Sequence, residues 1–252
     1  MIKNEQVILS QVELLIKMYE RGELGGEIMP EDINPGLEKT SKDNYIYFTL
    51  PMALNYRRNS YKLWESAKAT YEDKATAWVY QPELVVKASF AELQAALTKY
   101  NLALFKVRQT DIWLKLSMSI MTLFNGDLRA LFTMFNNDVV KIRDYVQKEH
   151  KKAFPYLSGN KICNYWLYVV HIYCGAQYTH LEALNVAADT HVIKATHRLG
   201  LITDQELESA NVQLIVIDRW SQLFKNTKYK PIDIHTILWL WSRNGFKEII
   251  NE

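Results

Sequence analysis

Cysteine, glycine and proline are scarce in this 252-residue sequence, which holds two cysteines, nine glycines and six prolines. Cys163 and Cys174 are too few for a disulfide scaffold or for a four-cysteine zinc or iron–sulfur site, and they fit a reducing compartment. The few glycines and prolines argue against a fold rich in hairpins and tight turns. An uncharged apolar run of about 18 residues is also missing, and no cationic stretch leads into an apolar run at the N-terminus. We therefore expect a protein of the cytoplasm, associated with the nucleoid, or of the nucleus, that is neither secreted nor inserted in a membrane.

Aromatic residues and unevenly spread charge are what the sequence has instead. The chain contains 15 tyrosines, nine phenylalanines and seven tryptophans, and its net charge is only +2. Residues 1–50 carry five basic and nine acidic side chains, whereas 141–161 carries six basic and two acidic ones, and 219–230 carries four basic ones and no acidic one. Localised basic patches are typical of proteins that bind polyanions. Solvated helix faces give the same pattern, so charge alone leaves both interpretations open.

Apolar residues recur at helical spacing through most of the chain, and no pair of strands is indicated. This pattern predicts an all-α fold of about ten helices. We expect residues 1–44 to form an acidic N-terminal helix and loop, and 45–252 to form a helical domain that packs as one body or as two lobes with a cleft between them. Capping-box patterns start at Ser89 and at Thr203. The expected helices cover 5–20, 50–71, 89–100, 110–124, 127–135, 138–150, 162–173, 189–199 and 203–224, and a last one starts at Pro231.

A compact turn at 154–161 separates two of these helices, so that residues 138–173 form a helix, a hairpin and a second helix. A hairpin of this kind presents backbone N–H groups at the start of a helix, where the helix dipole favours anions. Such a geometry binds phosphate without reading the base sequence. The residues that we expect to contact phosphate are Leu157, Ser158 and Gly159 of the hairpin, with Lys151 and Lys152 of the preceding basic run.

A second segment, 186–201, places Asp189 at the head of a helix in the sequence Asp-Thr-His-Val and ends in Arg-Leu-Gly at Gly200. Together with the hairpin that ends in Gly-Asn-Lys at Lys161, this pattern resembles the helix–hairpin–helix DNA glycosylase superfamily over about residues 45–245. The sequence has Leu157 where the family hairpin has its first glycine. Lys161 and Asp189 are 28 residues apart, more than in most members. The large separation of Lys161 and Asp189 in the sequence and the absence of a four-cysteine cluster resemble the archaeal 8-oxoguanine DNA glycosylase branch.

The resemblance implies a chemistry for two residues. In the superfamily, the lysine at the position of Lys161 attacks the sugar C1′ in bifunctional members, and the aspartate at the position of Asp189 is catalytic in nearly all members. A carboxylate stabilises the positive charge that develops on the sugar as the N-glycosidic bond breaks, and the amine forms a Schiff base that permits strand cleavage. Burial and a helix N-terminus both favour the uncharged amine that this step needs. Taken alone, Asp189 is typical of a helix N-cap, and Lys161 is typical of a solvated or phosphate-positioning lysine.

The resemblance also implies that the target base leaves the stack and that a polar helix end fills the gap. On their own, the residues of that helix end fit an exposed polar face, and the aromatic candidates for the wall of a base pocket also suit a core. His191 is expected to pack near Asp189 or to touch phosphate. The candidates for duplex insertion are Asn55, Arg57, Arg58 and Asn59, and those for the base pocket are Tyr45, Phe48, Trp166, Trp239 and Trp241.

These patterns predict a DNA N-glycosylase with AP-lyase activity that excises a damaged base from duplex DNA, an oxidised purine if the branch resemblance holds. We expect a monomer with no organic cofactor and no iron–sulfur cluster. The six histidines are too scattered to predict a metal site, although an ion bridging the hairpin and phosphate is compatible with the sequence. Two alternatives stay open: a catalytically silent hairpin protein that binds DNA or RNA, and a nucleosidase that acts on a free or tRNA-derived nucleoside.

Overall fold

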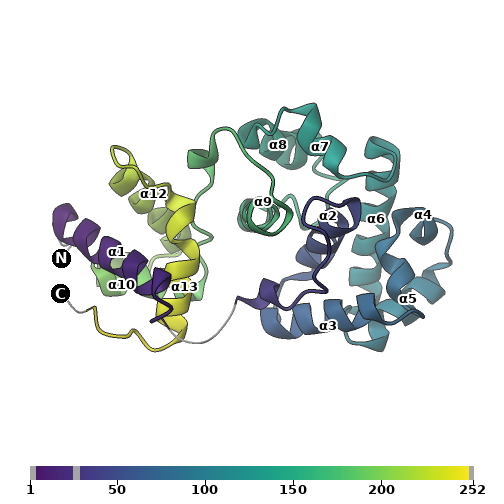
Figure 1. Cartoon of the computed structure of the whole chain (residues 1–252), viewed down its shortest axis with the longest axis horizontal. Coiled ribbons are helices and arrows are strands. Elements are labelled where there is room, and N and C mark those ends of the chain that lie inside the picture. The colour runs from purple at the N-terminus through teal and green to yellow at the C-terminus, as the bar shows by residue number, and fades with distance from the viewer. Residues whose placement is uncertain (1–3, 25–28, 250–252) are drawn as a thin grey trace. The chain divides into compact units, whose positions relative to one another are not determined.

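The computed structural model describes residues 4–24 and 29–249, and every regular element in these two ranges is helical. The only β-type pairing found within them is an isolated bridge between Asp138 and Thr179. The prediction of an all-α fold is therefore confirmed. The α-helices are α1 (Glu5–Glu20), α2 (Lys42–Thr49), α3 (Ser60–Glu72), α4 (Pro82–Val85), α5 (Phe90–Lys99), α6 (Lys106–Phe124), α7 (Arg129–Met134), α8 (Val139–Asp144), α9 (Asn160–Cys174), α10 (Thr190–Leu199), α11 (Asp204–Leu207), α12 (Val212–Phe224) and α13 (His235–Arg243) (Figure 1).

The described chain has thirteen α-helices rather than about ten, because α2 and α4 were not expected and the expected helix 203–224 forms two. Two of the expected long helices are broken. In the region 50–71, a 3-10 turn at Pro51–Leu54 is followed by a loop before α3 begins at Ser60. Arg57 in that loop has a φ of 51°, a left-handed conformation that interrupts a right-handed helix. The segment 203–224 is likewise split into α11 and α12, and a π-helical turn, Tyr145–Glu149, follows α8.

Helix starts and stops that the sequence marks clearly are found where they were expected. The Oγ of Ser89 accepts a hydrogen bond from the Glu92 backbone N–H at 3.2 Å, and the Glu92 carboxylate accepts one from the Ser89 backbone N–H at 2.9 Å. Thr203 and Glu206 form the same capping box. Gly200 ends α10 with a φ of 81°, a conformation that glycine adopts without strain. Short-range hydrogen bonding is enough to specify these ends.

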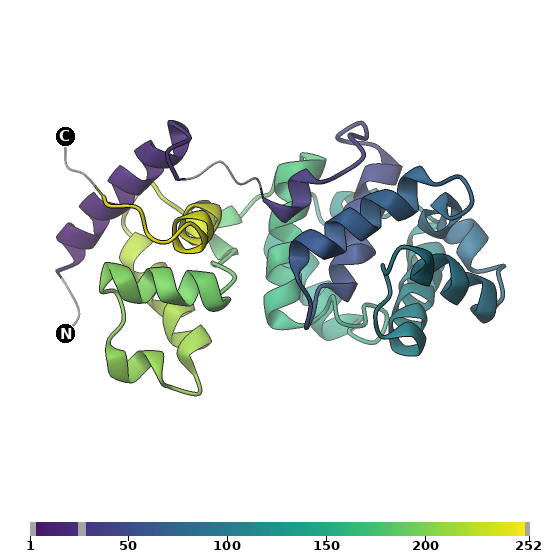
Figure 2. The same ribbon diagram turned by 90° about the horizontal axis from the view of Figure 1, so that it is seen from below.

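The chain folds into two compact units. One, here called the split unit, consists of residues 1–29 and 181–252, and the other, the central unit, consists of 30–180. The domain boundary expected between residues 44 and 45 is therefore not where the compact units divide. The reason is the apolar face of α1, which is formed by Ile8, Val12, Leu15 and Met18 and is buried against the distant α13 (Figures 1 and 2).

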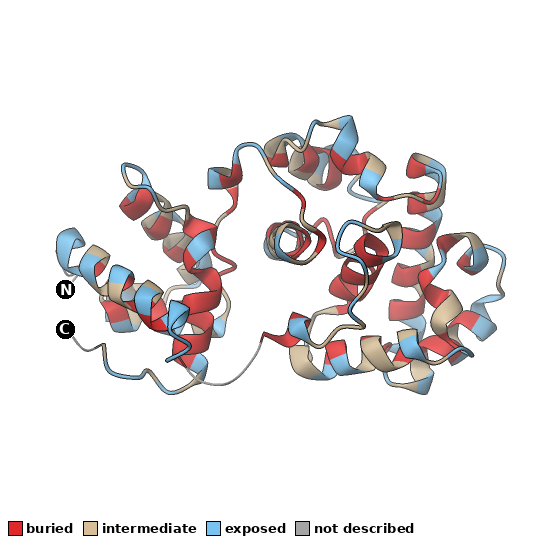
Figure 3. Ribbon diagram, viewed as in Figure 1, coloured by how far each residue is buried: buried red, intermediate tan, exposed pale blue. Residues whose placement is uncertain are grey.

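The split unit has its core between α10, α12 and α13, with α1 beside α13. Val192, Ala195 and Leu199 form the inner face of α10, and all three are buried. Buried residues also cover most of α13 (Figure 3). The indole N–H of Trp220 on α12 donates a hydrogen bond to Oγ1 of Thr196 at 2.9 Å. This bond satisfies two polar groups inside the core and fixes α12 against α10.

The central unit is built around α6 and around the packed pair α2 and α9 (Figure 1). Its buried tryptophans each donate an indole hydrogen bond across elements. Trp166 on α9 donates to Oγ1 of Thr49 on α2 at 2.9 Å, and Trp113 on α6 donates to the Val79 carbonyl at 2.8 Å. The first of these contacts fixes α9, which follows the hairpin 154–159, against α2.

Candidate functional site

Asp189 is the N-cap of α10, and both of its carboxylate oxygens are held. Oδ1 accepts hydrogen bonds from the backbone N–H groups of His191 and Val192, each at 2.9 Å. Oδ2 accepts a hydrogen bond of 3.1 Å from the indole N–H of Trp239 on α13. The residue is half-buried. Hydrogen bonds to a charged oxygen are stronger than neutral ones and define its direction, so Asp189 is a fixed negative charge at the head of a helix.

Aromatic and basic groups surround this carboxylate in the split unit. The His191 ring packs against Trp239 at 5.2 Å between centroids, and its Nδ1 lies 3.3 Å from Oγ of Ser242. The guanidinium of Arg243 lies over the Trp239 ring at 5.4 Å. Burial lowers the pKa of His191 below its ordinary value, so the imidazole is neutral at pH 7. We call Asp189, His191, Trp239, Ser242 and Arg243 the Asp189 cluster.

The hairpin 154–159 turns most of its own amides inward. The backbone N–H groups of Leu157, Ser158 and Gly159 donate to the carbonyls of Pro155, Phe154 and Tyr156 at 2.8, 2.9 and 3.0 Å. Leu157 and Ser158 are also buried, so these two residues shape the hairpin rather than present its surface. Gly159 is exposed and is the N-cap of α9, where no side chain caps the first turn. The amides that begin α9, at Asn160, Lys161 and Ile162, are therefore the ones placed to meet an anion.

The left-handed residue of the hairpin is Tyr156, with a φ of 63°, and not Leu157, which occupies the position of the first family glycine. A left-handed conformation costs a side-chain-bearing residue about 1 kcal/mol or more. The φ of Gly159 is −66°, so this glycine is not required by its dihedral angle. A Cβ at Gly159 would lie 3.2 Å from the carbonyl oxygen of Tyr156. The lack of a side chain at Gly159 therefore lets the backbone of the turn approach itself closely.

Lys161 is exposed in the first turn of α9, as are Lys151 and Lys152 before the hairpin. No ion pair of these three lysines occurs within residues 4–24 and 29–249, whereas the neighbouring Lys148 pairs with Asp144 at 2.9 Å. The burial that we expected to favour an uncharged Lys161 amine is therefore absent. Lys161 belongs to the central unit and Asp189 to the split unit.

A stack of aromatic rings, which the sequence analysis missed, joins the hairpin to the loop 55–59. Tyr156 stacks on Tyr56 at 4.2 Å with an interplanar angle of 13°, and Tyr56 stacks on Phe105 at 5.7 Å and 6°. The guanidinium of Arg108 lies over Tyr156 at 5.0 Å. We call these four residues the tyrosine stack. Its members come from three separate segments, and nothing in the hairpin sequence around Tyr156 indicates the other three residues, so only tertiary packing brings them together.

Exposed apolar residues continue the tyrosine stack. Phe105 is 44% exposed, and the neighbouring Leu104 and Val107 are 47% and 68% exposed. Arg108 and Arg57 are exposed beside the same segments. Aromatic faces next to arginine suit the stacking of nucleic-acid bases and contacts with their phosphates.

Three of the four candidates for duplex insertion make hydrogen bonds that hold their own loop, and the fourth, Arg57, makes none within the described part of the chain. Arg58 donates to the carbonyls of Leu102 at 2.7 Å and Asn101 at 3.2 Å, and burial lowers its pKa to about 10. Asn59 caps α3, and Asn55 accepts a hydrogen bond from Oγ of Ser60 at 3.1 Å. Arg57 and Asn59 are exposed, whereas Asn55 and Arg58 are half-buried. These four residues do not form a helix face, because the expected helix is broken there.

The aromatic candidates for a base pocket are core residues in this structure. Phe48 stacks on Tyr173 at 4.9 Å, and Trp166 is fully buried against α2. Tyr45 packs edge-on against Phe132 at 5.2 Å. Trp241 is buried and donates to the Lys247 carbonyl. Trp239 is nearly buried and uses its indole N–H on Asp189. Protein atoms therefore cover the faces that a flipped base would need, except where the Asp189 cluster borders solvent.

Groups of three or more His, Cys, Asp or Glu that could hold a metal ion do not occur in the ranges 4–24 and 29–249. Over the same ranges, no helix has both the length and the hydropathy needed to cross a membrane. A scan against protein-family models and a search of curated proteins find no match for this sequence.

Proposed function

We propose that this protein is a DNA N-glycosylase with AP-lyase activity that removes a damaged base, an oxidised purine, from duplex DNA. The observation that carries the proposal is the Asp189 carboxylate, held at the head of α10 by three N–H donors. A fixed negative charge of this kind stabilises a sugar cation without reorganising during the reaction. Its position matches the catalytic aspartate of the superfamily that the sequence resembles.

Lys161 supplies the nucleophile in this proposal. Its Nζ forms a bond to C1′ of the damaged nucleotide while the bond from C1′ to the base breaks, and the electron pair leaves with the base, which takes up a proton. Loss of a proton from the new amine and opening of the sugar ring give a Schiff base, from which β-elimination releases the 3′ phosphate. The amine has to lose its charge first. Because Lys161 is exposed, contact with DNA has to supply the desolvation that favours the neutral amine.

The surface of the central unit supports a nucleic-acid partner. The lysines at 151, 152 and 161 surround the hairpin, and none has an ion pair in the described part of the chain. The tyrosine stack and the exposed residues 104–107 lie on the same unit. Basic groups contact phosphates, and exposed aromatic rings contact unstacked bases.

Borohydride trapping tests the proposal. The protein is incubated with duplexes that carry an abasic site, 8-oxoguanine or uracil, and borohydride reduces any Schiff base to a stable covalent bond. We expect a protein–DNA band that is lost in Lys161→Ala and retained in Lys115→Ala, which removes an exposed lysine paired with Asp111 on α6. A band of undiminished intensity in Lys161→Ala contradicts the proposed nucleophile.

Base release tests the role of Asp189 separately. Asp189→Asn keeps a good N-cap residue and removes the negative charge, so we expect a folded protein that binds DNA and releases base at least about 100-fold more slowly. Retention of both activities in the Lys161 and Asp189 variants overturns the mechanism.

A catalytically silent nucleic-acid-binding protein is the second candidate function, and the exposure of Lys161 is the observation that favours it. Under this alternative the hairpin and the tyrosine stack bind DNA, and Asp189 is only an N-cap. Both candidates retard the migration of DNA in a gel. Only the silent binder gives neither a trapped covalent band nor free base with any of the three duplexes.

A further inference from the structure

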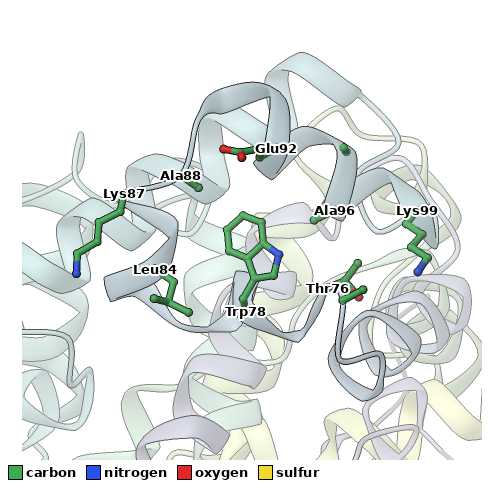
Figure 4. Close-up of a pocket in the computed structure, with 10 residues that line it drawn as sticks. Thr76, Trp78, Leu84, Lys87, Ala88, Glu92, Ala96 and Lys99 are labelled. Atoms are coloured by element: carbon green, nitrogen blue, oxygen red, sulfur yellow. The ribbon is translucent and has the colours of Figure 1, made fainter.

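A pocket of about 820 Å³ opens on the central unit between the 3-10 turn Ala77–Tyr80, α4 and α5. Trp78 lies at its centre, and small residues, among them Ala95 and Ala96, leave room around the indole. Figure 4 shows Lys87 and Lys99 at opposite ends of the pocket and Glu92 on a third side. The volume is within the range of sites that bind small organic molecules, roughly 300–1,000 Å³.

Trp78 differs from every other tryptophan of the chain in its indole N–H. The other six donate a hydrogen bond to a protein acceptor, whereas Trp78 has no acceptor among residues 4–24 and 29–249. Its nitrogen faces the side of the pocket where Ala96 and Lys99 lie (Figure 4). No protein acceptor in the described residues therefore fixes this N–H, and its signal can report on a molecule that binds beside the indole.

The charged residues of the pocket leave one cation free. Lys99 pairs with Asp73 at 2.5 Å. The Glu92 carboxylate is held by the backbone N–H and the hydroxyl of Ser89, at 2.9 and 2.7 Å. Lys87 is exposed and has no acidic partner in the described part of the chain. The unused groups are thus one aromatic face, one N–H donor and one ammonium group.

We propose that this pocket binds a planar aromatic molecule with a single negative charge. Its ring stacks on the indole face of Trp78, and its anionic group meets Lys87. The indole N–H lies in the plane of the Trp78 ring, so it reports on the stacked molecule without bonding to it. A polyanion fits less well, because several unpaired cations would be needed to neutralise successive phosphates. The proposal is independent of the DNA glycosylase function, since the pocket shares no residue with the Asp189 cluster, the hairpin or the tyrosine stack.

Titration of the full chain with 2-naphthoate, followed in the indole region of a ¹H–¹⁵N spectrum, tests the proposal. The Trp78 signal is the one that disappears in Trp78→Phe. We expect this signal to shift and saturate, while the other indole signals stay in place. The uncharged analogue 2-naphthamide should bind about fivefold more weakly than 2-naphthoate.

Two variants and a control locate the site. Lys87→Ala should weaken 2-naphthoate about fivefold and leave 2-naphthamide unchanged. Ala95→Trp, at an exposed position on the wall, should fill the pocket and abolish the shift. Lys115→Ala on α6 should bind as the unaltered protein does. An unmoved Trp78 signal, equal binding of the charged and neutral probes, or a shift that survives Ala95→Trp overturns the proposal.

Discussion

The indole N–H of Trp239 donates a 3.1 Å hydrogen bond to Oδ2 of Asp189, which links α13 to the N-cap of α10. The two helices pack closely along their lengths. Oδ1 of the same carboxylate is committed to the amides of α10, so Trp239 is the group that orients the second oxygen. Trp239 thus acts as a positioning residue for the charge on which the proposed function depends.

Replacement of Trp239 by phenylalanine tests this link. Trp239→Phe keeps an aromatic ring against His191 but removes the donor, so we expect base release to slow about tenfold with DNA binding retained. The measurement is single-turnover base release. In an Asp189→Asn background the same replacement should have no further effect, and a full tenfold effect there would mean that Trp239 acts through something other than the carboxylate.

Adjacent arginines in the loop 55–59 have opposite expected roles. Arg58 is half-buried and holds the Leu102 and Asn101 carbonyls, so Arg58→Met should lower the free energy of unfolding by about 2 kcal/mol. Arg57 is exposed, so Arg57→Ala should change the free energy of unfolding by less than about 0.5 kcal/mol. The same substitution should weaken DNA binding. Urea unfolding and gel retardation measure the two effects. A stable Arg58→Met protein would show that those hydrogen bonds contribute little.

Burial raises the pKa of Glu31, which lies in the 3-10 turn Pro30–Asp32 of the central unit, to about 7. Hydrogen bonds from Trp64, at 3.0 Å, and from Tyr165 act against this shift, and the nearby Asp32 adds to it. Between pH 4.5, the ordinary pKa of this carboxyl group, and about pH 7, the folded state therefore keeps a proton that the unfolded state has lost. The free energy of unfolding should fall by up to about 3 kcal/mol as pH rises through this window. Above about pH 7, Glu31 should make no further contribution to the pH dependence of stability.

Urea unfolding of the unaltered protein and Glu31→Gln at about pH 5 and pH 8 measures this contribution. Glutamine keeps an acceptor for Trp64 and carries no charge, so the variant should be the more stable one at the higher pH. Parallel pH profiles of the two proteins would contradict the prediction.

Tyr156 combines a left-handed backbone with a stacked ring, and two substitutions separate these properties. Tyr156→Ala and Tyr156→Gly both remove the stack on Tyr56, but only glycine relieves the backbone. We expect the glycine variant to be about 1 kcal/mol more stable than the alanine variant, and both to bind DNA more weakly than the unaltered protein. Equal stability of the two variants would show that the turn relaxes without cost.

Local signals account for the parts of the fold that the sequence analysis predicted well. The helix 5–20 coincides with α1, and the capping boxes at Ser89 and Thr203 and the cap at Asp189 form as expected, because each depends on residues within one turn. The expected helix 50–71 is interrupted, because Arg58 turns inward to carbonyls more than forty residues away. No pattern within that segment reports a partner so distant.

Sequence by itself determined that the chain is helical, where most helices begin, and that Asp189 and Lys161 each lie at the start of one, since hydrogen bonds and apolar periodicity within a segment decide these features. Only the tertiary structure decided that α1 packs with α13 and that Trp239 holds Asp189 rather than lining an open base pocket. It also decided that Tyr56, Phe105 and Tyr156 form one stack. These relationships join residues far apart in the chain, and they arise because apolar faces and buried polar groups find partners wherever packing brings them.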